Sequence, residues 1–248
     1  RVHLLKEPRM GIVYARNAAV NHMLEQEFDA LAFIDDDEWV TTDLWLYNLL
    51  DAQSETAADI VTGPVYSVPE TKNIAWAENA MGRHPPKNHL EPVYKFYTSN
   101  VLILREVLEH ITPAFDERFA LTGSSDYHFS LKCRKRGFKA VYTANAPVNE
   151  TFPKSRANLK WFIMRGYRNG SGYTRAEVFE ADNNTVFLKI FLMAGARFVR
   201  SIYTIIYGIV RLKKSHVFLG CMRFFSAIGT IAGLCGFTYE EYNIIHGQ

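Results

Sequence analysis

Four consecutive carboxylates, Asp35 to Glu38, stand directly after the short apolar run 31–34. Residues 31–34 are predicted to form a buried strand. Because side chains alternate along a strand, Asp35 and Asp37 are expected to project together where the chain leaves the sheet. Carboxylates this close repel one another when desolvated, and a hard cation such as Mg2+ or Mn2+ offsets that repulsion. The sequence therefore predicts a divalent-cation site at this strand end.

A solvated acidic turn is the alternative interpretation of the same residues. Asp37 or Thr41 would then act as the N-cap of the next helix. The position at the carboxyl end of a central strand favours the cation site, because ligands in open α/β sheets gather at that edge.

The composition is that of a globular protein. Hydrophobic residues make up 48% and charged residues 22% of the 248 residues, enough for one sizeable α/β domain with an appendage. The 28 Lys and Arg residues nearly balance the 26 Asp and Glu residues, which argues against nucleic acid as the main partner. The three cysteines, Cys133, Cys221 and Cys235, lack the paired spacing of zinc sites and favour a reduced, cytoplasmic setting.

Strands and helices are predicted to alternate through the first 65 residues, as in right-handed βαβ units. The apolar pattern favours strands within 1–8, at 31–34 and at 59–65, with helices over 11–27 and 44–52 between them. Further along, it favours a strand at 101–104, helices over 105–110 and 127–137, and a strand at 139–143. The chain opens as a strand already under way and shows no signal peptide, so we expect a fragment of a longer protein.

Two stretches depart from this alternation. Residues 66–98 hold several prolines among aromatic and basic residues without periodicity, which is typical of a lid or a binding loop. After a short helix over 159–167, residues 186–214 have the pattern of a basic amphipathic helix, and 217–237 are more apolar. This tail could lie in a membrane interface, pack as core or dimer helices in a homo-oligomer, or span a membrane through 217–237.

Five short motifs, taken in order, resemble the inverting family 2 glycosyltransferases of GT-A fold, and among them bacterial exopolysaccharide enzymes such as the succinoglycan-type glucosyltransferases. The motifs are Gly11 with Ala15-Arg16-Asn17, Asp35-Asp36-Asp37, Gly63-Pro64-Val65, Ser99-Asn100-Val101, and Gly123-Ser124-Ser125-Asp126 followed by 134–137. The resemblance covers residues 1–175. It implies an α/β fold with a GT-A-like, mainly parallel mixed sheet flanked by helices, and it leaves 185–248 as a helical appendage for membrane association or oligomerisation.

The resemblance also implies roles for individual residues. Asp35 and Asp37 would hold Mn2+ or Mg2+, with Asp37 the more direct ligand, and Glu150 stands where many relatives place a further metal-binding His. The residues implied in binding the nucleotide-sugar donor are Arg16, Asp35, Asp36, Asn100 and Arg168. An ordinary surface cation is the other interpretation of Arg16, although a helix start is a poor place for one.

Asp126 is the candidate catalytic base. An inverting transfer needs one carboxylate to take the proton of the acceptor hydroxyl during its attack. The family usually shows Glu-Asp here and this chain has Ser125-Asp126, so the second acid is kept and the first is lost. Asp126 could instead only cap the helix that starts at Tyr127.

The function implied is transfer of a hexose from a nucleotide-diphosphate sugar, expected to be UDP-linked, to a lipid-linked or polysaccharide acceptor. The expected place is the cytoplasmic face of the plasma membrane. Without the Gln-x-x-Arg-Trp motif of processive synthases, one sugar per encounter is expected. The family's first nucleotide-binding strands precede the triple aspartate by more residues than this chain supplies, which leaves a non-catalytic partner or scaffold as an alternative. A nucleotidyltransferase, the third hypothesis, would ordinarily show a Gly-rich phosphate loop, and none is visible.

Overall fold

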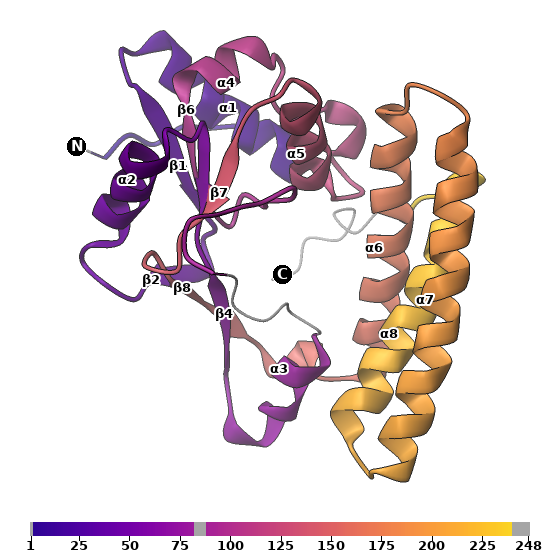
Figure 1. Cartoon of the computed structure of the whole chain (residues 1–248). Helices are drawn as coiled ribbons and strands as arrows, with labels where there is room; N and C mark the ends of the chain where they lie inside the picture. Colours follow the sequence, from indigo (N-terminus) through magenta and orange to yellow (C-terminus); the bar gives the residue numbers. More distant parts are fainter. Residues whose placement is uncertain (1, 82–87, 240–248) are drawn as a thin grey trace. The chain divides into compact units, whose positions relative to one another are not determined.

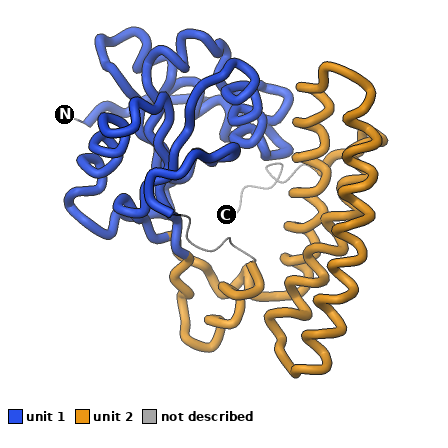
Figure 2. The backbone as a smooth tube through the Cα atoms, viewed as in Figure 1, with its two compact units in different colours: residues 1–66, 86–149, 240–248 blue, residues 67–85, 150–239 orange. Residues whose placement is uncertain are grey.

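The computed structural model describes residues 2–81 and 88–239, which fall into two compact units. Unit 1 holds the described residues 2–66 and 88–149, and unit 2 holds 67–81 and 150–239 (Figure 2). Two of the passages between the units fall within strands, one at 65–69 and one at 148–152. These units are defined by packing alone, and the domain boundary near 175 that the resemblance implied stays a prediction.

A five-stranded mixed sheet forms the centre of unit 1. Its order is β1 (Ala30–Ile34), β6 (Asn100–Leu104), β3 (Ile60–Thr62), β7 (Ala140–Tyr142) and β5 (Glu91–Pro92). The expected mixed sheet is confirmed, but of its four neighbouring pairs only β3–β7 is parallel. The prediction of a mainly parallel sheet was wrong because β6 runs in the reverse direction between β1 and β3.

Helices flank this sheet (Figure 1). They are α1 (Ile12–Glu25), α2 (Trp45–Thr56), α4 (Arg105–His110) and α5 (Ser125–Lys135). Leu49 of α2 packs in one buried cluster with Val61 and Leu102, which are paired across β3 and β6. An aromatic pair packs beside β1: the ring centroid of Phe33, in β1, lies 5.9 Å from that of Phe115.

The alternation along β1 decides which way its acidic end faces. Ala32 packs against the cluster of α2, whereas Phe33 contacts Phe115. Side chains two positions apart share a face of a strand, so Asp35 continues the face of Phe33. The sequence pattern therefore places Asp35 on the side of the sheet that carries Phe115 and α5.

Gly63 lies where three segments meet at this edge of the sheet. A Cβ atom at this position would lie 2.3 Å from the carbonyl oxygen of Ala146 and 2.5 Å from the side-chain nitrogen of Asn100. Backbone atoms cannot yield cheaply to such an overlap, so we expect Gly63→Ala to lower the free energy of unfolding by about 1–3 kcal/mol. Urea denaturation would measure this, with Gly137→Ala as a contrast, since nothing lies within 4 Å of a Cβ atom there and only its positive φ of 84° strains the substitution. Equal stability of Gly63→Ala and the unmodified chain would contradict the prediction.

Unit 2 consists mainly of three long helices, which run side by side (Figure 1). They are α6 (Leu159–Phe179), α7 (Thr185–Val210) and α8 (Lys214–Leu234). The short helix α3 (Trp76–Ala80) joins them through an aromatic cluster in which Trp76 lies 4.7 Å from Phe218 between ring centroids. A second sheet has the order β2 (Glu38–Val40), β8 (Val148–Phe152) and β4 (Val65–Pro69).

Helix α8 packs closely on α6 through glycines. A Cβ atom at Gly166 or Gly170 would lie 2.1 Å from the carbonyl oxygen of Met222 or Ser226, and one at Gly229 would lie 2.1 Å from that of Tyr167. Such approaches bring two helix backbones together, so α8 is held against protein along its length. Within the described residues, α8 is also the helix long and apolar enough to cross a membrane.

Three predicted elements differ from those observed. Residues 2–7 are not a strand: Val2 and Leu4 are exposed and pair with no strand in the described part of the chain. The region 66–98 was predicted to lack regular structure, but it contains β4, α3 and β5, while 82–87 lie outside the described residues. The helix predicted over 159–167 continues to Phe179.

Candidate active site

The site begins with an ion pair between the end of β1 and the start of α1. An Nη atom of Arg16 lies 3.5 Å from Oδ1 of Asp35, and the other Nη atom donates a hydrogen bond of 3.3 Å to the hydroxyl of Ser125. The Arg16 guanidinium also lies over the ring of Phe115, 5.7 Å from its centroid. With 11% of its side chain exposed, Arg16 links strand β1 to the first residue of α5.

Asn17, the neighbour of Arg16, anchors this part of α1 through two hydrogen bonds to the backbone of Phe115. Its side-chain amide donates to the carbonyl oxygen of Phe115 at 2.8 Å, and its oxygen accepts from the Phe115 N–H at 3.0 Å. This pair of hydrogen bonds fixes α1 against the segment that leads to α5. The sequence contains Asn17 in a motif, but its partner 98 positions away could not be identified without the fold.

The acidic residues after β1 form a closed turn. The Asp35 N–H donates to Oε2 of Glu38 at 3.0 Å, and the Glu38 N–H donates to the Asp35 carbonyl at 3.1 Å. Asp36 and Asp37 at the tip of the turn are exposed, whereas Asp35 is half-buried. Glu38 therefore closes the turn, and the three aspartates present their carboxylates at different depths.

Asp126 lies in the first turn of α5, after a sharp bend in the chain. Gly123 and Ser124 both have left-handed backbone conformations, with φ of 73° and 66°. Oδ1 of Asp126 accepts a 2.7 Å hydrogen bond from the N–H of Tyr127. Asp126 therefore lies inside α5 and not at its N-cap, which is Ser124, and its second carboxylate oxygen takes no part in the bond to Tyr127.

Arg16 links Asp35 to the first turn of α5, where Asp126 lies. Burial raises the pKa of Asp35 above its usual value, Arg16 opposes the rise, and the negative charges of Asp37 and Asp126 add to it. A charge acts on a pKa in this way only at short range. Unit 1 therefore brings together Arg16, Asp35, Asp37 and Asp126, which are separated by up to 110 positions in the sequence.

Asn100 has a different place from the one expected. It is 1% exposed, and its amide donates to the carbonyl oxygens of Pro64 at 3.0 Å and Ala146 at 2.7 Å. Its oxygen accepts from the indole N–H of Trp45 at 3.0 Å. Both amide N–H groups are used within the protein, so Asn100 cross-links three segments, and its predicted contact with the donor stays a prediction.

We expect Asn100→Ala to destabilise unit 1. The change would leave the buried carbonyls of Pro64 and Ala146 and the Trp45 indole without this partner, at about 1–3 kcal/mol for each group left unsatisfied. Thermal unfolding followed by circular dichroism would show a lower midpoint. If Asn100→Ala keeps its thermal unfolding midpoint but loses affinity for the donor, Asn100 contributes to donor binding and not mainly to stability.

The remaining candidates, Glu150 and Arg168, belong to unit 2. A carboxylate oxygen of Glu150 lies 3.4 Å from Nη1 of Arg156 in the same unit. Arg168 lies within α6. Their predicted contacts with metal and donor stay predictions.

The residues of unit 1 fit a divalent cation. Asp35 and Asp37 supply carboxylate oxygens. Burial, with a further contribution from the charges of Asp37 and Asp126, raises the pKa of Asp35, and a cation would stabilise its ionised form. The described residues contain no group of three or more His, Cys, Asp or Glu side chains arranged to hold a metal by themselves.

Comparison with known proteins relates the chain to glycosyltransferases. Residues 1–112 match the model of glycosyl transferase family 2. The chain is 29% identical over 169 residues to the succinoglycan biosynthesis protein ExoM of Rhizobium meliloti (strain 1021), which covers 68% of this chain and 53% of that protein. The chain thus spans about half the length of this relative. The mannosyltransferase PcManGT from Pyrobaculum calidifontis, solved in complex with GDP-Man and Mn2+, aligns with a TM-score of 0.57 at 16% identity, over 94% of this chain and 69% of that one.

The mixed sheet and its flanking helices have a GT-A-like fold. The first 112 residues carry the glycosyl transferase family 2 domain, and the resemblance indicated by the five motifs is confirmed.

Proposed function

We propose that this chain transfers a hexose from a nucleotide-diphosphate sugar, expected to be UDP-linked, to a saccharide or lipid-linked acceptor in exopolysaccharide synthesis. The observation that carries the proposal is that Arg16 joins Asp35, at the end of β1, to Ser125, the neighbour of Asp126. The charges of Asp37 and Asp126 also add to the raised pKa of Asp35. A sugar transfer of this kind needs carboxylates in two roles close together. One role is to hold the cation that binds the donor diphosphate, and the other is to accept the proton of the acceptor hydroxyl. The relative involved in succinoglycan biosynthesis supports the exopolysaccharide setting.

Asp126 is the proposed base. The acceptor oxygen forms a bond to the anomeric carbon while the bond from that carbon to the diphosphate breaks on the opposite face. The proton of the acceptor hydroxyl passes to the carboxylate of Asp126. Because one oxygen of Asp126 is held by the Tyr127 N–H, the carboxylate has a fixed orientation from which the other oxygen can accept the proton.

Asp35 and Asp37 are proposed to bind Mn2+ or Mg2+, which when bound supplies Lewis-acid stabilisation of the departing diphosphate. Asp36, exposed at the tip of the same turn, is proposed to contact the donor. Arg16 would hold the donor phosphates as a charge-assisted hydrogen-bond donor, since its guanidinium carries donors beyond the one used by Ser125. Arg168 and Glu150 are proposed as further donor and metal contacts.

The proposed acceptor and location follow from the tail of the chain. The one candidate span among the described helices and the basic character of 185–214 support attachment at the cytoplasmic face of the plasma membrane. An acceptor linked to a membrane lipid would then be presented close to the enzyme.

An assay for released nucleoside diphosphate tests the proposed function. The full chain is incubated with UDP- and GDP-linked hexoses, Mn2+ and a membrane extract, and products are identified by mass spectrometry. Metal-dependent release with a new glycosylated product supports the proposal. Donor binding by calorimetry without turnover for any sugar would favour the alternative, a non-catalytic partner in a polysaccharide assembly complex, for which the loss of the family's Glu at Ser125 is the motivating feature.

A further inference from the structure

The exposed apolar side chains of unit 2 are concentrated on one face of α7. Eleven large apolar side chains of α7 are exposed, compared with two on α8. Representatives along the helix are Phe187, Phe191, Phe198, Ile202, Ile206 and Ile209. Placed at 3.6 residues per turn, all eleven fall within an arc of about 160°. We call this arc the outer face of α7.

The opposite side of α7 is covered by its own unit. Ile190, Ala194, Ser201, Thr204 and Gly208 are buried. A Cβ atom at Gly208 would lie 2.7 Å from the backbone nitrogen of Val217 near the start of α8. The outer face is therefore the side of α7 directed away from its packing partner α8.

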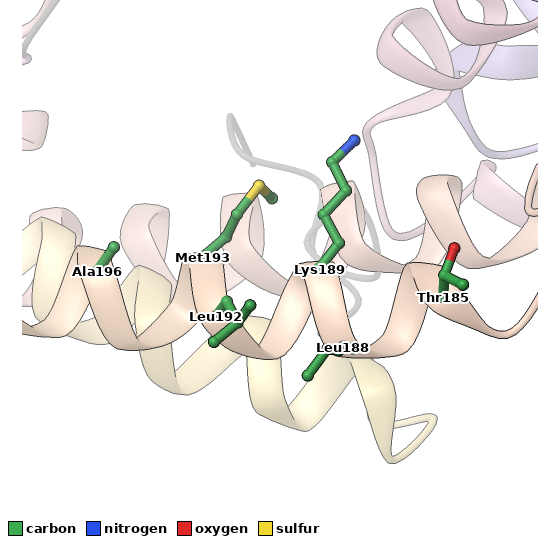
Figure 3. A pocket seen from close by; sticks show the side chains of 6 residues that line it. All are labelled: Thr185, Leu188, Lys189, Leu192, Met193 and Ala196. Atoms are coloured by element: carbon green, nitrogen blue, oxygen red, sulfur yellow. The ribbon is translucent and has the colours of Figure 1, made fainter.

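A row of cations follows one border of the outer face. Lys189, Arg200 and Arg211 recur at eleven-residue intervals, and eleven residues make about three helical turns. The three side chains therefore follow one another along the helix, about 16 Å apart. Lys189 also lines an open hollow of about 510 Å³ with Leu188 and Leu192, whose side chains point away from its ammonium group (Figure 3).

These cations have no acidic counterpart in their own helices. No Asp or Glu occurs between residues 183 and 239, where seven Lys and Arg residues occur. Arg223 of α8 donates instead to the hydroxyl of Thr204 at 2.9 Å, and Arg197 donates to that of Thr230 at 2.9 Å. Burial and the nearby charge of Arg200 lower the pKa of Arg223. Both guanidinium groups thus have neutral hydroxyl partners, which leaves positive charge for an external anion to offset.

We propose that the outer face of α7 lies in the interface of an anionic lipid bilayer, with the helix parallel to the membrane and its cation row among the headgroup phosphates. An apolar arc bordered by Lys and Arg is the pattern of helices that lie in this plane. A second copy of the chain is a poorer occupant, because a two-fold contact through this face would bring two acid-free cationic rows together. The inference deepens the proposed membrane location and rests on that part of the proposed function, not on the transfer chemistry.

Flotation of the full chain with vesicles tests this inference. We expect binding to vesicles that contain phosphatidylglycerol and little binding to phosphatidylcholine alone. Arg200→Gln should weaken binding about fivefold, and the triple change of Lys189, Arg200 and Arg211 to Gln about a hundredfold. Ile202→Asp should weaken it at least about tenfold by placing a charge in the apolar arc.

Matched controls separate docking from folding and from catalysis. Lys160→Gln changes an exposed cation on α6, and Leu46→Asp changes an exposed apolar residue on α2; both should leave binding unchanged. Asp126→Asn should bind vesicles like the unmodified chain whether or not the proposed transfer is correct. Circular dichroism confirms that each variant is folded.

Three results would overturn the inference. The first is vesicle binding that is indifferent to lipid charge and to every α7 variant. The second is a dimer in sedimentation analysis that Ile202→Asp dissociates, which would make the outer face a contact between copies. The third is attachment that resists high salt and survives the triple change, which would indicate that α8 spans the bilayer.

Discussion

Asp126→Asn is expected to lower kcat by about 10²–10⁴-fold, since this is the usual contribution of a positioned general base. Asparagine has the same shape, and its oxygen can still accept the hydrogen bond from the Tyr127 N–H, so α5 should keep its first turn. Removing one negative charge near Asp35 relieves repulsion, so binding of the donor with Mn2+ should not weaken. The nucleoside diphosphate release assay measures kcat, and calorimetry measures donor affinity.

Asp51→Asn provides the matched control, because it makes the same change at an exposed carboxylate on α2. It should leave both kcat and donor affinity unchanged. Asp126→Glu keeps the carboxylate but displaces it, and partial recovery of kcat would show that the base itself is needed. Full turnover in Asp126→Asn would remove Asp126 from the proposed role.

The acidic residues of the site could be predicted from the sequence because each stands in a short local pattern. The triple aspartate follows a strand, and Asp126 stands in the motif that precedes a helix. What joins them could not be predicted, because Arg16 reaches Ser125 across 109 positions and only the packing of α1 and α5 brings the two together. A charged residue at a helix start was the available signal for Arg16.

Strand direction was the main error in the predicted sheet. Alternating strands and helices favour parallel pairing, but β6 enters from the long region 66–98 and runs opposite to β1 and β3. Its register places Asn100 beside Ile34, directly before the acidic turn. Asn100 therefore lies beside the end of β1, where it is buried and hydrogen-bonded within the protein.

Glycines caused the other error, in the length of α6. The predicted helix over 159–167 stops before Gly170, since glycine ordinarily favours a position at a helix C-terminus. In the structure Gly170 lies inside α6, where a Cβ atom would collide with the carbonyl oxygen of Ser226 on α8. The conformational cost of glycine is offset by close packing with a helix more than fifty positions away, which no local pattern reveals.

Asp37→Ala is expected to weaken metal-dependent donor binding about a hundredfold or more, since a bridging cation is worth several kcal/mol to a charged diphosphate. Asp37 is exposed, so its loss should not disturb the fold, whereas Asp35 is half-buried and paired with Arg16. Asp37 is thus the cleaner position for this test. Calorimetric titration with UDP in the presence and absence of Mn2+ measures the effect, and Glu55→Ala, an exposed carboxylate on α2, should behave as the unmodified chain.

Variants of Asp37 and Asp126 should lose different properties if the two carboxylates have separate roles. Asp37→Ala should lose the Mn2+-dependent part of UDP binding, while Asp126→Asn should keep it and lose turnover. UDP binding that is equal with Mn2+ and with a chelator would contradict the cation site at the end of β1. Loss of UDP binding in both variants would mean that both carboxylates bind the donor. The proposal that Asp126 acts on the acceptor hydroxyl would then be wrong.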